Sequence, residues 1–592
     1  MIALPVFVCP RGTTVACTAT NGTLNPNNPF ASQGQAALIL GRLSDIRESD
    51  ETLSQAYRGA AGIGGSFGKG WRFNIEGTGM KVNLDRTIGG RVFVQNFLDT
   101  VRDGSYNWVN PGLNSQAVRD FIAPTIRNRA TSELYQVQSS VSKEVFDLPG
   151  GPLQVAVGAS YRFEKVDAPT LNPGVAGQPT QQYFRVNAFS ATGSRNVKSA
   201  YFEIAAPILP QLEVNLSGRY DKYSSGQDNF SPKISGRFQP IPQITLRGAY
   251  SKGFRIPSFA EANAGPTTGF VTITPPASFR ALYPAGSTYA SSYSLGLTSA
   301  GNSNLKPEKS RSITAGIVVE PVPWLSLAVD YYNIKKTNVI ASADYTIATA
   351  AYYANGTIPT GFTVIPDQPD INNPTLRPRA GFVVSSYING PSQKTSGLDF
   401  TATARIPITD GIRLISSLQA TYVIDYNQTF INPDGTTSLQ RYAGTLGNFQ
   451  ITSGSGTPRW RDSWQNTLDF GVASLSATTY YTGGYSTTAE DTSGSDTAFK
   501  CGATDPNGVD FNTHTYRDST PVSCFVKKFI NVDLNLSADV NENRSVYANV
   551  LNVLDTKPPY DGTTYGGYQY NPAWANAGII GRAFRAGAKV KF

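Results

Sequence analysis

The residues that could perform chemistry in this chain are few and far apart. Among its 592 residues the chain has one histidine, His514, and four cysteines. A Ser-His-Asp or Cys-His centre would therefore have to form around that one histidine. The glycine-rich residues 62–68 (GIGGSFG) lie within an alternating strand pattern, where glycine allows bending or close packing. We predict that the protein is not an enzyme and has no catalytic residues, no metal and no cofactor.

The cysteines form two local couples, Cys9 with Cys17 and Cys501 with Cys524. Neither couple has the CxxC spacing of a zinc site. We predict disulfides that close loops in an oxidising compartment, and we favour the Cys501–Cys524 pair over the first couple.

Tyrosines in the long connections are candidates for ligand contact, because amphipathic rings stack on sugars or on aromatic siderophores. They are Tyr283, Tyr289, Tyr293, Tyr345, Tyr352 and Tyr353. Such rings also pack loops and interface belts, and we favour that packing role here. The acidic loop residues are too dispersed for a calcium cage. They include Asp367, Asp370, Asp491 and Asp496.

The elements that must position these residues are strands with alternating side chains. In the last ten residues, positions 584, 586, 588, 590 and 592 are apolar, while Arg585, Gly587, Lys589 and Lys591 fall on the other face. The same period recurs at residues 153–164, 212–221, 243–251, 310–320, 324–333, 396–407, 411–424 and 530–541. All candidates together amount to about 17 strands of roughly 10–15 residues.

The connections between these strands alternate between short and long. Short turns lie at residues 68–70, 149–152, 240–242, 321–323, 409–411 and 541–543, and long loops lie near 167–197, 255–308, 336–392, 425–458, 486–526 and 554–576. Short periplasmic turns and long external loops are typical of an outer-membrane barrel. No apolar run approaches the ~18 residues of a membrane helix. We therefore predict an all-β fold, a large antiparallel transmembrane β-barrel with long external loops.

The net charge of +8 does not indicate nucleic acid, because Lys and Arg are scattered along the strands without a basic run. The first ten residues are apolar but contain prolines and no positive segment, so they do not resemble a secretory signal. Residues 111–128 favour a short helix within a loop.

An ordered set of motifs resembles the TonB-dependent outer-membrane receptors, most strongly over residues 195–335 and 527–592. Phe254, Arg255, Ile256 and Pro257 resemble the family's Phe-Arg-Ala-Pro motif. Asn302, Asn304, Leu305, Lys306, Pro307 and Glu308 resemble its Asn-Pro-Asn-Leu-Lys-Pro-Glu motif, with Ser303 in place of the first proline. Residues 329–335 (VDYYNIK) and 549–555 (NVLNVLD) follow in the family's order. We favour structural roles over ligand contact for the first two motifs.

The resemblance implies that the barrel-assembly machinery recognises the last strand through Phe584, Val590 and the terminal aromatic Phe592. It also implies the TonB complex, outer-membrane lipid and a small-molecule nutrient as partners, and no nucleic acid. The family's haem receptors carry a histidine between the two motifs, and residues 258–301 contain none. Haem is therefore disfavoured, and a siderophore-iron complex or an oligosaccharide is the expected class of ligand.

The chain also departs from the family, whose members begin with a signal peptide, a TonB-contacting segment and a plug before a barrel of about 22 strands. Residues 1–33 resemble none of these and are assigned only as an N-terminal loop. We interpret residues 1–592 as the partial barrel of such a receptor, without its plug and not competent alone. We expect the last strand to be an open edge. Two alternatives remain: a plug-free porin-type channel and a secreted all-β adhesion protein.

Overall fold

The computed structural model places most of the chain. It describes residues 2–591 except 14, 16, 38, 42, 173–181, 185, 187–188, 285, 371–372, 391, 432–436, 446–455, 487–508, 511–514, 517–524 and 562–568. Cys501, Cys524, His514, Asp491, Asp496 and Phe592 lie outside the described residues.

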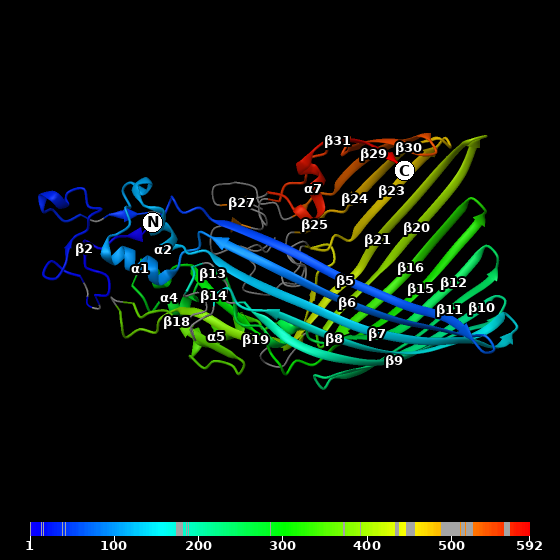
Figure 1. Ribbon diagram of the computed structural model, residues 1–592, viewed down its shortest axis with the longest axis horizontal. Helices are drawn as coiled ribbons and strands as arrows, with labels where there is room; N and C mark the ends of the chain where they lie inside the picture. Colours follow the sequence, from blue (N-terminus) through cyan, green and yellow to red (C-terminus); the bar gives the residue numbers. More distant parts are fainter. Residues whose placement is uncertain are drawn as a thin grey trace.

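Seventeen long antiparallel strands form the wall of a barrel in the described part of the chain (Figure 1). They are β5 (Ser49–Phe67), β6 (Trp71–Gly89), β7 (Ile126–Leu148), β8 (Gly151–Ala168), β9 (Ala191–Leu209), β10 (Leu212–Tyr223), β11 (Asp228–Ile241), β12 (Ile244–Arg255), β15 (Glu308–Val322), β16 (Leu325–Thr337), β20 (Ser392–Thr409), β21 (Ile412–Ile431), β23 (Trp460–Asp469), β24 (Ala473–Thr482), β29 (Phe529–Asn541), β30 (Arg544–Leu551) and β31 (Ala583–Val590). The short β22 (Thr437–Arg441) pairs with the end of β21. The predicted all-β barrel of about 17 strands is confirmed; a complement of 22 stays a prediction.

The two faces of the wall differ as the alternation predicts. Leu246, Ile313 and Ile317 lie on the outward face and are 41%, 38% and 37% exposed. The inward face carries polar side chains such as Arg247, whose Nε donates to Asp330 Oδ1 across 2.7 Å. Because the apolar face meets no second sheet, the wall is built for lipid outside and water inside. This arrangement argues against the secreted adhesion alternative, which needs a dry core.

The last strand continues this pattern. Phe584 pairs with Val550 of β30, which pairs with Leu534 of β29, so these three side chains share the outward face. Phe584 and Val590 are 73% and 47% exposed. Arg585 and Lys589 occupy the inward face, opposite Asn549 and Ser545.

The two ends of the sheet meet at β5 and β31. The strand order makes them neighbours in a closed barrel. On their other sides, β5 is in register with β6 and β31 with β30. All 19 residues of β5 are exposed. The strand order closes the barrel with β31 and β5 as hydrogen-bonded neighbours, so the open edge that we expected at β31 is wrong.

Two external loops, between β12 and β15 and between β16 and β20, fold together into what we call the loop domain. Its elements are α3 (Phe259–Asn263), β13 (Thr267–Ile273), α4 (Ala277–Arg280), η3 (Thr288–Ala290), β14 (Tyr293–Ala300), β17 (Ile340–Ser342), α5 (Tyr345–Ala354), β18 (Phe362–Pro366) and β19 (Ala380–Asn389). β14 of the first loop pairs in parallel with β19 of the second. Their shared core contains Phe279, Leu295, Ala380 and Val383.

A second cluster at the long-loop end joins the N-terminal segment to the loop between β6 and β7 (Figure 1, blue). Its elements are β1 (Ile2–Ala3), β2 (Phe7–Val8), β3 (Thr23–Leu24), η1 (Ala31–Gln33), β4 (Leu40–Gly41), α1 (Val94–Asp103), η2 (Pro111–Leu113) and α2 (Gln116–Ile122). Leu4, Tyr106, Trp108 and Ile122 form its core. The predicted short helix is α2, which ends at Ile122 because Pro124 disfavours helical backbone at the preceding residue, Ala123.

The remaining short elements lie near the end of the chain. They are β25 (Tyr485–Ser486), β26 (Val509–Asp510), β27 (Thr515–Tyr516), β28 (Phe525–Val526) and α7 (Pro572–Ile580). No helix in the described ranges is both long and apolar enough to cross a membrane.

Candidate functional site

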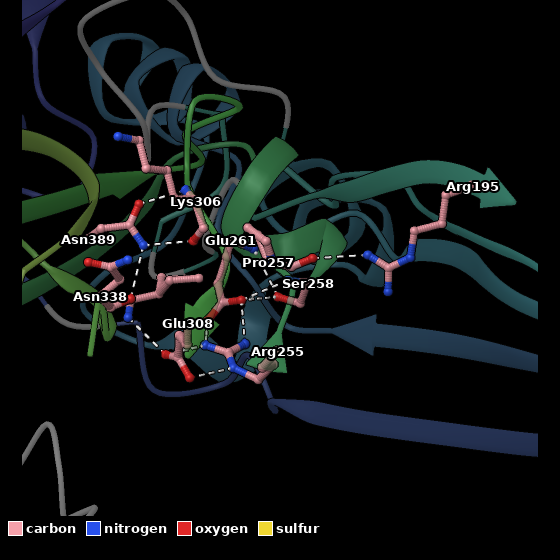
Figure 2. Close-up of polar contacts among 10 residues, drawn as sticks. Arg195, Arg255, Pro257, Ser258, Glu261, Lys306, Glu308, Asn338 and Asn389 are labelled. Carbon is pink, nitrogen blue, oxygen red and sulfur yellow. Dashed lines mark hydrogen bonds and ion pairs between the residues drawn. The ribbon is translucent and has the colours of Figure 1, made fainter. Parts of the chain in front are cut away.

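The two predicted family motifs meet at the external rim of the barrel. Arg255 ends β12, Glu308 begins β15, and the two residues are paired in register. Arg255 Nη2 donates to Glu308 Oε1 across 2.7 Å, and Nε donates to Glu308 Oε2 across 3.0 Å. Nη1 also donates to Glu261 Oε2 across 2.7 Å. Figure 2 shows the guanidinium between these two carboxylates, a geometry in which one arginine satisfies both.

The helix α3 fixes Glu261 in this position. Ser258 is its N-cap: the Ser258 hydroxyl accepts from Glu261 N, and Glu261 Oε2 accepts from Ser258 N across 2.7 Å. Burial acts to raise the pKa of Glu261, but hydrogen bonds from Arg255 and Ser258 outweigh it and lower that pKa. Glu261 is therefore ionised at neutral pH, as an ion pair with Arg255 requires.

The second motif ties the loop domain to this ion pair. Asn302 Nδ2 donates to Tyr387 O across 2.8 Å, and Leu305 is buried. Lys306 N donates to Asn389 Oδ1 across 2.7 Å, and Asn389 Nδ2 donates back to Lys306 O across 2.8 Å (Figure 2). These bonds connect the start of β15 to the end of β19.

The side-chain amide of Asn389 also holds Asn338, a residue with an unusual backbone conformation. Asn389 Nδ2 donates to the carbonyl of Asn338, across 3.0 Å. Asn338 has a φ of 55°, the left-handed region that Asn tolerates better than most residues. Two residues further on, Ile340 N donates to Glu308 Oε1 across 2.8 Å. The chain leaving β16 is thus held against the same glutamate that binds Arg255.

The structure brings together Arg255, Asn302, Leu305, Lys306 and Glu308 as one rim site. Asn304 N donates to Asn302 Oδ1 within the same turn, at 2.9 Å. Phe254 faces Tyr223 edge-on at 6.0 Å between ring centroids, and Pro257 O accepts from Arg195 Nη1 at 3.0 Å. Pro307 precedes β15, where the ladder begins. These contacts support the structural role that we favour for the motifs.

Sequence reasoning missed three members of the site: Glu261, Asn389 and Arg195. The Ser258–Glu261 spacing is a readable capping box and could have placed Glu261. Asn389 is 83 residues from its partner Lys306, and no local pattern indicates that contact. Arg195 lies on β9, three strands away from β12.

Inside the barrel, just below the rim, arginines and aromatic rings form what we call the luminal arginine cluster. Arg195 Nε donates to Glu164 Oε2 across 2.7 Å, and its guanidinium lies 4.6 Å from the Phe259 ring centroid. Arg219 Nη2 donates to Ser199 Oγ across 2.8 Å and lies 5.7 Å from the Tyr201 ring centroid. Arg219 Nε also pairs with Asp221 Oδ1 at 2.9 Å, so both arginines have carboxylate partners. The Arg219 side chain is 41% exposed and that of Arg195 is 17% exposed, so Arg219 is the more accessible to a molecule in the lumen.

Most of the predicted loop tyrosines are packing residues. Tyr283, Tyr293, Tyr352 and Tyr353 are buried in the loop-domain core, and Tyr289 and Tyr345 pack against it. Burial is the main reason why the pKa of Tyr293 and that of Tyr353 are raised, so both remain neutral hydroxyls. The Arg379 guanidinium lies 4.9 Å from the Tyr289 ring and 4.6 Å from the Tyr293 ring.

The described residues contain no group of three metal-ligating side chains. Asp367 instead accepts from Arg379 Nε across 2.6 Å, and Asp370 accepts from Asn373 across 2.9 Å. Cys9 and Cys17 are joined by a disulfide. The pair that we favoured, Cys501 and Cys524, lies outside the described residues and stays a prediction.

A hollow barrel with an apolar exterior, a polar lumen and external loops fixed at the rim defines an outer-membrane β-barrel receptor. The family model for the TonB dependent receptor-like beta-barrel matches residues 18–553. The chain belongs to this family of outer-membrane transport receptors.

Two solved structures show the same fold. The siderophore receptor PirA from Acinetobacter baumannii is 15% identical, with a TM-score of 0.55 over 92% of this chain and 63% of that one. The ferric enterobactin receptor PfeA from Pseudomonas aeruginosa, in complex with BCV-L6, is 16% identical, with a TM-score of 0.52 over 88% of this chain and 63% of that one. This chain thus spans less than two thirds of either receptor. No curated protein matches its sequence.

Proposed function

We propose that this chain forms the barrel of a receptor that imports a scarce small-molecule nutrient across the outer membrane with energy from TonB. The luminal arginine cluster, directly below the loop domain, is the observation that carries this proposal. Guanidinium groups bind anionic oxygens, and aromatic rings stack on catechol or sugar rings. A ligand admitted past the loop domain would meet both kinds of group at once.

The ligand class is a siderophore-iron complex or an oligosaccharide, and the siderophore is the first to test. Of the solved structures described above, PirA is a siderophore receptor and PfeA is a ferric enterobactin receptor. Ferric siderophores of the catecholate type carry negative charge, which suits Arg195 and Arg219. An oligosaccharide would instead use the rings of Tyr201 and Phe259.

Uptake by cells that carry the complete gene tests this function. We expect accumulation of radioactive iron from one siderophore of a panel, or of one labelled oligosaccharide, and loss of accumulation when TonB is deleted. Arg219→Lys keeps the charge but loses the planar donor fork, and it should lower the apparent affinity about tenfold. The matched control, Arg237→Lys, replaces another exposed inward arginine near the short turns and should leave uptake unchanged.

The proposal would be refuted if the uptake of every ligand tested were independent of TonB. A graded ion conductance of the purified chain in planar bilayers, together with TonB-independent uptake, would favour the porin-type alternative. A haem titration followed by absorbance checks the ligand class, and tight specific binding would contradict the expectation that disfavours haem.

A further inference from the structure

Four cations lie side by side on the outward face of the barrel wall. Lys252 of β12 pairs in register with Arg311 of β15. Arg311 pairs in turn with Lys335 of β16, and Lys335 pairs with Lys394 of β20. All four side chains are exposed. We call these four residues the basic row.

The strand period proves that the basic row faces outward. Side chains two, four or six positions apart on a strand share a face. Arg311 therefore shares its face with Ile313 and Ile317, and Lys252 shares its face with Leu246, all of them exposed apolar residues. The adjacent residues on the inward face are small and polar: Ser251, next to Lys252, pairs with Ser312, next to Arg311.

The row lies at the outer boundary of the apolar band. Eight positions toward the short turns, the same four strands carry Ile244, Val319, Leu327 and Ala402 in register. Eight residues of strand span about 26 Å, which a tilt of about 40° reduces to about 20 Å along the membrane normal. An apolar band is about 25 Å tall. The outward positions change from Tyr250 and Ile313 to Lys252 and Arg311 at the row, so the basic row marks the external end of the apolar stretch on these strands.

The arrangement is unfavourable without a counter-charge. Like charges directly opposite one another on neighbouring strands are destabilising. Lys394 has a partner, because its Nζ lies 3.1 Å from Asp425 Oδ2 on β21. Within the described part of the chain, Lys252, Arg311 and Lys335 have no carboxylate at ion-pair distance. Three adjacent cations thus face the membrane interface unpaired.

We propose that the basic row binds the phosphate groups of an anionic lipid in the external leaflet. The acyl chains would lie on the exposed apolar residues below, such as Ile313 and Leu246, which hold the headgroup at the height of the row. One lipid with two phosphates, or two lipids with one each, supplies the missing charge. Lys309, two positions beyond Arg311 on the same exposed face, extends the cationic surface outward. The ordered lipid would brace the wall beneath the loop domain.

The test compares lipid binding by the full chain and by two variants of equal charge. Native mass spectrometry in a neutral detergent measures adducts with phosphatidylglycerol, phosphatidylcholine and inorganic phosphate. The test variant is Lys252→Gln/Arg311→Gln/Lys335→Gln. The matched control, Lys233→Gln/Arg237→Gln/Arg405→Gln, removes three exposed cations from the inward face. A charge-preserving variant, Lys252→Arg/Lys335→Arg, checks that the site rather than the exact side chain matters.

The wild type should prefer phosphatidylglycerol, the test variant should lose roughly 100-fold in affinity, and the control should bind as the wild type does. The variant should fold, as judged by heat-modifiable gel mobility, because it removes repulsion. In phosphatidylcholine its unfolding temperature should be no lower than that of the wild type, and added phosphatidylglycerol should raise only the wild-type value. Equal losses in the two triple variants would overturn the proposal. Saturation by inorganic phosphate alone, or no preference over phosphatidylcholine, would do the same.

Discussion

Replacing Arg255 with alanine should loosen the loop domain while leaving the barrel intact. Arg255 donates to two carboxylates whose side chains are only 18% and 10% exposed, so its loss leaves Glu261 and Glu308 facing each other without a counter-charge. Breaking a fully buried pair costs about 3–5 kcal/mol. The Arg255 side chain itself is 45% exposed, so we discount this figure for solvent screening to about 2 kcal/mol. That free energy corresponds to about a 30-fold change in a local opening equilibrium.

Hydrogen exchange followed by mass spectrometry measures this opening. Amides of α3, of residues 302–308 and around Ile340 should exchange about 30-fold faster in Arg255→Ala, because their protection depends on local opening. Strand β24, on another part of the wall, should be unchanged. Arg247→Ala is the matched control, since it removes a luminal ion pair with Asp330 whose partners are more exposed, at 50% and 29%. Exchange in the three rim segments that changes less than threefold in Arg255→Ala would refute the anchoring role.

Three further predictions concern the external regions. Tyr353→Phe removes the hydroxyl that accepts from Ala380 N and bonds to Tyr293 Oη, so the loop domain should lose about 1–2 kcal/mol, measured by protease susceptibility. Tyr289→Phe removes a hydrogen bond, to the carbonyl of Gln368, that is more exposed to solvent, so this control should change the protease susceptibility much less. Reducing the Cys9–Cys17 disulfide, which closes a sequence separation of 8, should cost the N-terminal segment about 2 kcal/mol, and no change in its exchange under reductant would contradict this. Burial acts to raise the pKa of Asp45, but hydrogen bonds from Tyr106 and Arg119 lower it below 3.8. That stabilisation is present above pH 3.8 and is lost as pH falls through the lowered pKa. Asp45→Asn should abolish this acid dependence.

The wall of the barrel could be predicted because alternation is a local property. Each strand carries its own period-2 pattern, so residues such as Phe584 and Arg585 could be assigned to opposite faces without knowledge of their neighbours. The motif around Arg255 and Glu308 was found by resemblance, and the structure shows why its members go together: they are cross-strand partners.

The loop domain could not be predicted, because its organisation is not local. β14 and β19 come from different loops and pair in parallel. The sequence of neither strand indicates which other strand it will pair with. The helix α5 had a readable start at Asp344, whose side chain accepts from Thr346 N, but its tyrosines were assigned only to a long loop. The luminal arginine cluster was missed because its two arginines come from different strands, Arg195 from β9 and Arg219 from β10, and each strand carries only that one arginine.

The parallel pairing of β14 with β19 has a mechanical consequence. Two loops that leave the barrel between different pairs of strands are joined into one small sheet, so neither can swing out without the other. Their rigid body has its pivots where the chain enters and leaves the rim, at Arg255, Glu308, Asn338 and Asn389. The two external loops therefore form one unit at the rim, and a movement of either loop would have to carry the other with it.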